Sequence, residues 1–594
     1  MRTHYPRTAH LPWSPGASPD DIRAADLSGL DGREVVVTEK LDGENTTLYR
    51  DGVHARSLDS GHHPSRAWVK GLQGRIGPRI EAGRRICGEN LYARHSIPYD
   101  ELDSWFYGFS VWDGDECLHW DRTTWMLHGL GVPTPRVLWR GVFDERALRG
   151  LRLDLARQEG YVVRTVEGFG RAEFGRRVAK WVRPSHVRTD THWMHSAVVA
   201  NGLGPAAPLW AVRSGAAPDA GALLHAVGLG EEPGPGPMPV DGVAVDAVSG
   251  ALDVLGRTGD SRLAGVLAVL LHGMHRPRLA ARLIPPLGMR LARRTADLVG
   301  LYGNLQRPYP DEIRQAGLLR MAAAVDLGVL HAVAGAVLVG RTDTATVQAR
   351  EQVEWSQLHA VEAGLLGEDP LAALRSGLRT ALAEAGVGRE AADRCWAEAR
   401  EACAEGRIGC GGAEEAVAAT WRWREGTYPR LVHLVGPSGS GKSTYADALP
   451  GPVTRVSLDA IRTARGSRSD QRANSDVLRE GLARLDSALA ERGTVVWDAT
   501  SLHIRQRSLV TAVARRRNAL TTQVVTLVPE EELAARNARR AHPVPSDVLD
   551  GQVHRYAPPY PGEAHRTWYL GGDGGVEDRE GSLYGTRDAH DADQ

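Results

Sequence analysis

The chain has 594 residues, too many for one hydrophobic core, so roughly three or four domains are expected. Hydrophobic residues make up 42% and charged residues 24%, which is typical of a soluble globular protein. The net charge of -1 excludes a polycation that coats nucleic acid. Any surface that binds nucleic acid must therefore be a local basic patch.

The N-terminus, the longest apolar stretch and the cysteines favour a protein of the reducing cytoplasm. Residues 1–20 contain no apolar run behind their basic residues, so no signal peptide is predicted. The stretch 321–340 is long enough to span a membrane, but Asp326 and His331 interrupt it. Because a charge at mid-helix is costly in lipid, a buried helix is the better interpretation. The five cysteines form no C-x-x-C pair, which argues against a zinc ribbon and a disulfide framework.

Lysine is rare in this chain. Of the 72 Lys and Arg residues, only four are lysines: Lys40, Lys70, Lys180 and Lys442. A retained lysine therefore indicates a position that needs an ammonium or a nucleophilic amine, which a guanidinium cannot supply. Three of the four lie in the motifs described below.

Composition predicts a multidomain protein of α+β and α/β class. Residues 1–200 alternate short β-rich runs with a few helices, and residues 201–260 form a Gly/Ala/Pro-rich linker with room for one helix. Residues 261–425 have the 3.6-residue periodicity of a helical domain, and residues 426–570 alternate strand, loop and helix. The Gly/Asp-rich segment 571–594 is expected to be a disordered tail. Strands are expected at Val35–Val37, Phe106–Trp112, Gly160–Arg164, Arg177–Val182, Leu431–Val435, Thr454–Leu458, Thr494–Trp497 and Gln523–Val528, and a helix at Lys442–Leu449.

The first motif set starts where a strand and a turn present Lys40, in the K-x-D-G pattern of Lys40–Gly43. That pattern alone recurs by chance, but five further elements follow it in order: His54-Ala-Arg-Ser57, Cys87-Gly-Glu-Asn-Leu-Tyr92, Trp105-Phe-Tyr-Gly-Phe109, Glu159-Gly-Tyr-Val-Val-Arg164 and Val178-Ala-Lys-Trp-Val-Arg183. The set, over about 190 residues, resembles the covalent nucleotidyltransferases, specifically RNA ligases of the bacteriophage RNA ligase 2 type. No lysine lies between Lys180 and Lys442, so the lysine-bearing OB-fold motif of DNA ligases and capping enzymes is absent.

The resemblance implies that Lys40 attacks the α-phosphate of ATP and becomes covalently bound to AMP. The AMP is then transferred to an RNA 5′-phosphate, and it is released when a 3′-OH attacks that phosphate. Because only a neutral amine is nucleophilic, the pKa of Lys40 is expected to be lowered by partial desolvation or by a cation such as Lys180. Glu89 and Glu159 are expected to bind ribose hydroxyls or Mg²⁺ (or Mn²⁺), with Glu159 as the candidate metal ligand. The other nucleotide-binding candidates are Asp42, Gly43, Asn45 and Arg56.

Two parts of this motif set leave alternatives open. Tyr107 and Phe109, two apart on one strand face, are suited to stacking on adenine, and core packing is the alternative for both. The last motif of the family carries two basic residues as K-x-K, but Val178 takes the first position here. Arg177 or Arg183 is expected to replace the missing lysine.

The second motif set is a phosphate-binding loop. Residues 436–444 fit G-x-x-x-x-G-K-[ST] between an apolar strand and a helix. Backbone amides of the loop, whose glycines are Gly436, Gly439 and Gly441, are expected to cradle phosphate. Lys442 is expected to reach the β- and γ-phosphates and Ser443 to bind Mg²⁺, with Thr444 completing the motif. The motif specifies nucleotide binding and leaves the acceptor open.

The segment that follows, over about 140 residues, resembles polynucleotide kinases through the D-x-x-R spacing of Asp459 and Arg462. The resemblance implies that Asp459 is the general base on a 5′-OH and that Arg462 holds a neighbouring substrate phosphate. Asp498, at the end of a strand, is expected to position Mg²⁺ or the substrate. A lid of arginines is expected to stabilise the transferring phosphoryl group, and its candidates are Arg536, Arg539 and Arg540. The alternatives are a helix cap for Asp459 and a solvated face for the arginines.

The helical domain carries basic residues in the range 272–294 that either grip an RNA backbone or form a solvated face, and no phosphohydrolase motif or metal site is predicted there. Together the motifs predict an RNA end-repair enzyme whose kinase makes the 5′-phosphate that its ligase joins. The expected partners are RNA with broken ends, a cleaved tRNA being one candidate, and a separate protein that heals 3′ ends. Two alternatives remain: a P-loop kinase that acts on a small molecule, and a catalytically silent RNA-binding scaffold.

Overall fold

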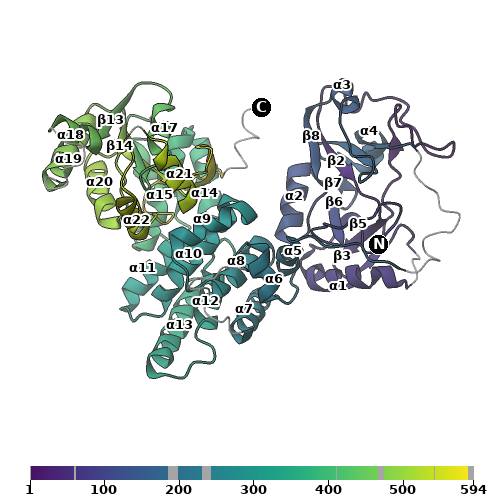
Figure 1. Ribbon diagram of the computed structural model, residues 1–594, viewed down its shortest axis with the longest axis horizontal. Coiled ribbons are helices and arrows are strands. Elements are labelled where there is room, and N and C mark those ends of the chain that lie inside the picture. Colours follow the sequence, from purple (N-terminus) through teal and green to yellow (C-terminus); the bar gives the residue numbers. More distant parts are fainter. Residues whose placement is uncertain are drawn as a thin grey trace. The chain divides into compact units, whose positions relative to one another are not determined.

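The computed structural model groups the chain into two compact units, Met1–Pro233 with Ser249–Leu263 and Gly234–Val248 with Ala264–Gln594. Each unit is described by itself below, and Figure 1 traces the elements of both. The residues that the structure describes are 2–58, 62–184, 198–230, 242–409, 411–465, 474–540 and 542–585.

The first unit contains two β-sheets (Figure 1). One has the strand order β1-β11-β9-β2-β8, and the other has the order β10-β7-β6-β5-β3-β4. The strands are β1 (Ala9–His10), β2 (Glu34–Lys40), β3 (Glu44–Tyr49), β4 (Gly52–His54), β5 (Arg84–Asn90), β6 (Phe106–Asp113), β7 (Glu116–Cys117), β8 (Val137–Val142), β9 (Gly160–Thr165), β10 (Phe169–Gly170) and β11 (Val178–Val182). The helices are α1 (Ala67–Ile76), α2 (Trp120–Gly129), α3 (Glu145–Arg149), α4 (Phe174–Arg177), α5 (Ala207–Arg213) and α6 (Ala220–Ala226).

The four strands predicted for this domain are confirmed as parts of β2, β6, β9 and β11. The three consecutive valines of β2, residues 35–37, are fully buried, because successive residues of a strand point to opposite faces and both faces are covered. Val35 and Val37 pack in one core, whereas Val36 packs with Trp120 and Val166 in another. A strand buried on both faces holds its last residue, Lys40, in a fixed place.

The second unit contains a six-stranded sheet in the order β13-β14-β12-β15-β16-β17. Strands β12 to β16 are parallel, which confirms the predicted α/β class, and β17 is antiparallel to β16. The strands are β12 (Arg430–Val435), β13 (Val453–Ser457), β14 (Thr494–Asp498), β15 (Leu520–Thr526), β16 (Arg566–Leu570) and β17 (Val576–Glu580). The helices between them are α17 (Lys442–Asp447), α18 (Leu458–Ala464), α19 (Asn474–Ala490), α20 (Ile504–Arg516), α21 (Glu530–Ala538) and α22 (Ser546–Arg555).

Two expectations drawn from composition are wrong. Residues 571–585 are not a disordered tail, because β17 pairs with β16 and Leu583 is fully buried; residues 586–594 lie outside the described residues. The segment 201–260 is more than a linker, since α5, α6 and α7 (Gly242–Val254) lie in it and α8 (Gly259–Leu270) begins in it. Its Gly/Pro-rich stretch 231–241 lies outside the described residues.

The middle of the chain is helical, as predicted. Its helices after α8 are α9 (Arg276–Leu287), α10 (Met289–Leu305), α11 (Asp311–Ala322), α12 (Leu327–Ala336), α13 (Thr344–Glu362), α14 (Ala372–Glu384), α15 (Arg389–Ala404) and α16 (Ala413–Ala418). The apolar stretch 321–340 contains α12, which buries Leu327, Leu330 and Val333, so the buried-helix interpretation is confirmed. No single helix of the described residues is long and apolar enough to cross a membrane, although α11 and α12, bent by 112°, pass that test together.

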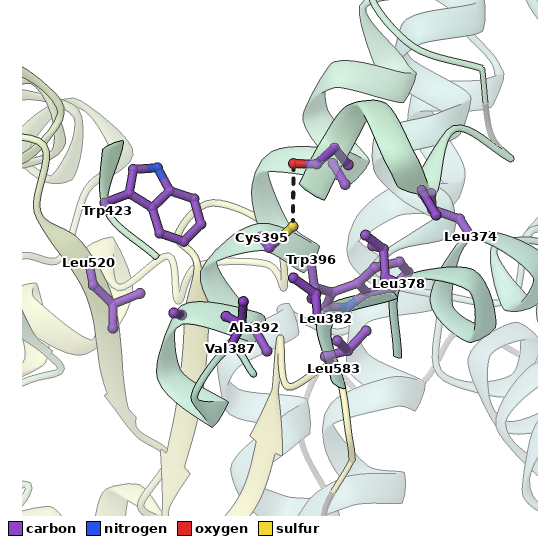
Figure 2. Packing of buried hydrophobic residues seen from close by; sticks show 14 of the residues in the cluster. Leu374, Leu378, Leu382, Val387, Ala392, Cys395, Trp396, Trp423, Leu520 and Leu583 are labelled. Carbon is purple, nitrogen blue, oxygen red and sulfur yellow. Dashed lines mark hydrogen bonds between the residues drawn. The ribbon is translucent and has the colours of Figure 1, made fainter. Parts of the chain in front are cut away.

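The helical region shares a hydrophobic core with the α/β sheet (Figure 2). Helix α14 contributes Leu374, Leu378 and Leu382, which lie on one face because they are four residues apart. Leu520 of β15 and Leu583 beyond β17 belong to the same cluster. Residues 261–425 therefore do not form the separate helical domain that composition suggested.

The cysteines depart in one respect from the expected reduced state. Cys87, Cys117 and Cys395 are buried free thiols, whereas Cys403 is disulfide-bonded. Burial raises the pKa of the Cys87 thiol to about 11 and that of Cys395 to about 12. These two thiols are therefore protonated and unreactive at neutral pH.

A buried charge cluster ties α10 to β17. Arg293, with 1% of its surface exposed, donates to Asp297 of its own helix at 2.9 Å and to Asp578 of β17 at 2.8 Å. It also pairs with Glu580 of β17. One guanidinium thus neutralises carboxylates from two elements that are far apart in sequence, and this explains why an acidic segment is ordered.

Replacing Arg293 with Ala should destabilise the second unit by about 3–5 kcal/mol, because it leaves the buried Asp578 carboxylate without its guanidinium partner, whereas Asp297 keeps Arg276. Urea unfolding followed by tryptophan fluorescence measures the loss. The control is Arg479→Ala, which removes an ion pair to Asp476 from a side chain that is 78% exposed. An equal, small effect of both substitutions would contradict the role given to the cluster.

Candidate active sites

The strand register brings Lys40, Glu159 and Lys180 together in the first unit. Strand β9 lies between β2 and β11, with Lys40 opposite Gly160 and Lys180 opposite Val162. Glu159 comes directly before β9. Gly160 is required here, because a Cβ at this position would lie 1.9 Å from the carbonyl oxygen of Trp181. In this dipeptide, Glu159 supplies a carboxylate beside Lys40, and Gly160 leaves the space that β11 needs to pair with β9.

Lys40 forms a partly buried ion pair with Glu159. Its Nζ donates to Glu159 Oε2 at 2.5 Å, and the two side chains are 23% and 5% exposed. Burial by itself would lower the pKa of Lys40, but the charges of Glu159 and Glu89 outweigh it and leave this pKa raised. The expected lowering of the Lys40 pKa is therefore wrong for this arrangement. Lys180 has a lowered pKa, through burial and the charge of Lys40.

The turn after Lys40 packs closely on β5. Gly43 N donates to Glu89 Oε1 at 3.3 Å, and a Cβ on Gly43 would lie 2.5 Å from the carbonyl oxygen of Asn90. Asn45 lies opposite Glu89 in the pairing of β3 with β5. Burial raises the pKa of Glu89 to about 8, with Glu159 adding to the shift and Lys40 opposing it. The structure thus brings the predicted Gly43, Asn45 and Glu89 to the Lys40 pocket.

Asp42 organises a loop beside this pocket. The side chain is buried, its Oδ2 accepts from Ser96 N at 2.9 Å and Ile97 N at 3.0 Å, and its backbone N donates to the Tyr99 hydroxyl at 2.9 Å. The loop held in this way carries His95, whose pKa burial lowers. Sequence analysis missed His95, because a lone histidine in a loop gives no signal until its neighbours are known.

The remaining predicted residues of this pocket are only partly brought together. Tyr107 is 8% exposed and its hydroxyl accepts from Asp103 N at 2.8 Å, and Phe109 packs against Tyr5 with ring centroids 5.2 Å apart. Both aromatics have packing partners, so stacking on adenine stays a prediction. The charge of Arg56 helps to lower the Lys180 pKa, so this exposed arginine is near the pocket.

The two candidates for the missing basic residue of the last motif bind elsewhere. Arg177 pairs with Glu173 at 2.8 Å, and Arg183 donates to the carbonyl oxygen of Leu155. Neither guanidinium has a contact with Lys40 or Lys180 among the interactions of the described residues. The replacement of the missing lysine by Arg177 or Arg183 therefore stays a prediction.

In the second unit, the loop between β12 and α17 has the backbone that its glycines permit. Gly439 and Gly441 have φ angles of +83° and +96°. A Cβ on Gly436 would lie 1.9 Å from Thr526 Oγ1, which bonds to Ser440 Oγ at 2.6 Å. The loop is thus closed against β15, and each predicted glycine has a steric reason.

Lys442 is buried at the start of α17 and donates to the carbonyl oxygen of Pro437 at 2.5 Å. Burial lowers its pKa to about 8, although Asp498 and Asp459 oppose the shift. The charges of both acids therefore act on the Lys442 ammonium. Ser443 and Thr444 follow it on α17 and are exposed.

The acceptor-side residues form two ion pairs. Asp459 in the first turn of α18 pairs with Arg462 at 2.7 Å, and Asp498 at the end of β14 accepts from Arg455 at 2.5 and 3.0 Å. Ser457 caps α18 through its Oγ, so the helix-cap alternative for Asp459 is wrong. Sequence analysis missed Arg455, since an arginine on a strand carries no motif.

The predicted arginine lid divides into two parts. Helix α21 lies over the phosphate-binding loop, and Arg536 comes within 3.7 Å of the place of a Cβ on Gly441. The charge of Arg540 acts on Lys442, and its Nη1 is buried without a hydrogen-bond partner. Arg539 is exposed. Arg536 and Arg540 are therefore at the loop, whereas Arg539 is not brought to it.

No group of three or more His, Cys, Asp or Glu side chains in the described part of the chain could hold a metal ion by itself. A Mg²⁺ that is held by one or two carboxylates and by substrate phosphates needs no such group. Glu89 and Glu159 in the first unit, and Asp498 with Ser443 in the second, supply the oxygen donors that this kind of binding requires.

Comparison with known proteins finds a family match in each unit. Residues 33–182 match the RNA ligase family model, and residues 431–559 match a family model described as an AAA domain. No curated protein shows significant similarity to the chain. Among solved structures, a gluconokinase from Sinorhizobium meliloti 1021 is 26% identical, with 24% of this chain and 83% of that chain covered and a TM-score of 0.19.

Two further solved structures are similar at lower identity. Naegleria gruberi RNA ligase with PPi is 18% identical, with 31% of this chain and 61% of that chain covered and a TM-score of 0.21. Chaetomium thermophilum Kti12 in complex with ADP-AlF3 is 18% identical, with 24% and 88% covered and a TM-score of 0.20. The chain thus spans about three fifths of the Naegleria ligase. From the two family matches, this chain contains an N-terminal RNA ligase domain and a C-terminal AAA domain that carries the P-loop motif.

Proposed function

We propose that the first unit seals RNA ends with ATP and that Lys40 is the nucleotide-carrying nucleophile. The observation that supports this most is the Lys40–Glu159 ion pair. The charge of Glu89 acts on the same ammonium, and Lys40 and Lys180 influence each other electrostatically. Lys40 first loses one proton to solvent; its Nζ lone pair then forms a bond to the α-phosphorus of ATP, pyrophosphate leaves, and a second Nζ proton is lost to give the lysyl-AMP phosphoramidate. Glu159 orients the amine, and Lys180 is placed to stabilise negative charge on the α-phosphate.

The later steps of sealing use the same pocket. The 5′-phosphate of an RNA displaces Lys40 from the AMP phosphorus, which restores the amine. A 3′-hydroxyl then attacks the RNA 5′-phosphorus, so that the phosphodiester forms and AMP leaves. A bound Mg²⁺ would neutralise phosphate charge, with Glu89 and Glu159 as the side chains that fit it.

We also propose that the second unit phosphorylates the 5′-hydroxyl of RNA. Asp459 is 53% exposed beside the loop and is placed to accept the hydroxyl proton, while Arg462 is placed to hold an adjacent RNA phosphate. Lys442, Arg536 and Arg540 surround the phosphate-binding loop with positive charge that would stabilise the transferred group. A bound Mg²⁺ would neutralise phosphate charge, and Ser443 and Asp498 are the residues that would hold it.

The two activities are chemically consecutive. A kinase that acts on a 5′-OH makes the 5′-phosphate that a ligase must adenylylate. RNA with broken ends, such as a cleaved tRNA, is therefore the proposed substrate, and a separate enzyme would supply the free 3′-OH. A P-loop kinase for a small molecule is the competing proposal for the second unit.

Incubation with α-labelled ATP and Mg²⁺ should leave label covalently on the protein, and Lys40→Ala should abolish it. Labelling should speed up as pH rises, because Lys40 must lose its proton and the neighbouring carboxylates raise its pKa. Lys70→Ala, at an exposed position of α1, is the matched control and should label normally. Label that persists in Lys40→Ala would exclude this lysine as the carrier.

Transfer of γ-phosphate to an oligoribonucleotide with a 5′-OH should fall by about 10²- to 10⁴-fold in Asp459→Asn, because a general base is lost. Asp476→Asn, at a side chain that is 52% exposed on α19, should leave the transfer rate unchanged. A wild-type protein that hydrolyses ATP but transfers no phosphate to RNA would favour the small-molecule alternative.

Binding of ADP or ATP should take up a proton near pH 8 to 9. Burial holds the pKa of Lys442 at about 8, and a phosphate at the loop should raise it, so affinity should fall as pH rises through this range. Calorimetry in two buffers of different ionisation enthalpy measures the protons taken up. Lys442→Met should remove this uptake, and uptake that is unchanged in Lys442→Met would assign it to another group.

A further inference from the structure

A side chain of α22 bonds to the backbone of the phosphate-binding loop. Ser438 N donates to Gln552 Oε1 at 2.8 Å, although the two residues are 114 positions apart in the sequence. Because a backbone N–H can only donate, the atom of Gln552 that faces it is the carbonyl oxygen. Ser438 directly follows Pro437, whose carbonyl oxygen accepts from Lys442 Nζ. One peptide unit therefore connects the contact of Gln552 with the contact of the Lys442 ammonium.

Helix α22 is fixed against the strand that closes the loop. Val553, which follows the glutamine, packs in a hydrophobic cluster with Leu533 of α21 and with Val528. Tyr556 caps the C-terminal end of α22, and its hydroxyl donates to the carbonyl oxygen of Thr526 in β15 at 2.9 Å. The hydroxyl of Thr526 is itself bonded to the loop. The loop and α22 thus share an anchor on β15, so the glutamine reaches the loop amide from a fixed position.

The side-chain oxygen that accepts from the Ser438 amide is uncharged. A carboxylate would accept the same N–H more strongly, because hydrogen bonds to an ionised acceptor are roughly twice as strong as neutral ones. It would also place a negative charge close to Lys442, which is expected to bind the β- and γ-phosphates, and this charge would repel them. A glutamine supplies the oxygen without the charge, so Gln552 is suited to a loop that receives a polyanion.

Helices α21 and α22 contact the loop at different places. A Cβ on Gly439 would lie 3.4 Å from the carbonyl oxygen of Leu533 in α21, and Arg536 Nη1 of the same helix lies 3.7 Å from the place of a Cβ on Gly441. Helix α22 contacts the residue before Gly439. Helix α21 thus brings a positive charge to the loop, whereas α22 holds its backbone. A backbone that is already held costs less to order when phosphate binds.

We propose that Gln552 is a positioning residue of the kinase site, which fixes the backbone at Ser438 through an uncharged acceptor and thereby sets the affinity of the loop for nucleotide. The hydrogen bond keeps the loop in one shape, and the absence of charge lets a triphosphate approach. The inference rests on the proposed kinase function of the second unit. It does not depend on which hydroxyl accepts the phosphate, so its test measures nucleotide binding.

The test compares ADP with the non-hydrolysable ATP analogue AMP-PNP by calorimetry on the full chain with Mg²⁺. All proteins carry Lys40→Ala, which prevents the proposed reaction of the first unit with the analogue. The binding that Lys442→Met removes is assigned to the phosphate-binding loop, since the first unit has a proposed nucleotide site of its own.

Gln552→Glu separates the hydrogen bond from the charge of its acceptor. The variant keeps an oxygen for the Ser438 amide, so its thermal midpoint without nucleotide should equal that of the wild type. Its affinity for AMP-PNP should fall at least about tenfold and its affinity for ADP should fall less, because the added charge repels a triphosphate more strongly. Both losses should shrink as the salt concentration rises.

Two further variants complete the comparison. Gln552→Met removes the acceptor and adds no charge, so the affinities for ADP and AMP-PNP should fall by the same factor, about 2- to 10-fold, at any salt concentration. Gln357→Glu makes the same change of charge at an exposed position of α13 and should bind both nucleotides as the wild type does.

The inference is wrong if Gln552→Glu binds both nucleotides as the wild type does, if its losses for the two nucleotides are equal and independent of salt, or if Gln552→Met leaves both affinities unchanged. The proposed RNA kinase function fails by a different result, namely nucleotide binding with the expected effects of these variants but no transfer of phosphate to the 5′-hydroxyl of RNA. Absence of any binding that depends on Lys442 would contradict both.

Discussion

The proposed sealing site of the first unit is centred on one ion pair, in which the partly buried Lys40 ammonium is held against the buried Glu159 carboxylate. Two nearby features position this pair and its neighbour Lys180. The buried valines of β2 fix the strand that ends in Lys40, and Gly160 lets β11 bring Lys180 alongside. The pair stores the amine in its charged form, since the neighbouring carboxylates raise the Lys40 pKa.

Sequence patterns predicted eight of the seventeen strands of the described residues, together with the candidate residues that surround Lys40 and the phosphate-binding loop, because each motif couples a side chain to local backbone geometry. The glycines of residues 436–441 and Gly160 are examples, because each motif places a glycine where the backbone has no room for a side chain or needs a positive φ. The direction of the shift in the Lys40 pKa could not be predicted in this way. It is set by the balance between burial and the charges of two carboxylates, and a motif does not contain the distances of these carboxylates from the amine. Composition failed for β17, since its acidic residues are ordered by Arg293, which lies far away in the sequence. His95 and Arg455 were missed for the same reason: their partners are distant in sequence.

The second unit joins two parts that composition had separated. Leucines of α14 share a core with the α/β sheet, and Arg293 of α10 neutralises carboxylates of β17. A unit of this kind should unfold cooperatively, so a substitution that destabilises the helical region should also destabilise the phosphate-binding loop. The helical region is therefore a structural part of the P-loop unit.

The most direct test of the Lys40–Glu159 pair is the pKa of Lys40 in protein labelled with ¹⁵N-lysine, since only four lysines contribute signals. The account predicts a Lys40 pKa above the ordinary value of about 10.4 for lysine, and a clear fall of this pKa in Glu159→Gln. A Lys40 pKa below the ordinary value in the wild type, or one that Glu159→Gln leaves unchanged, would contradict it.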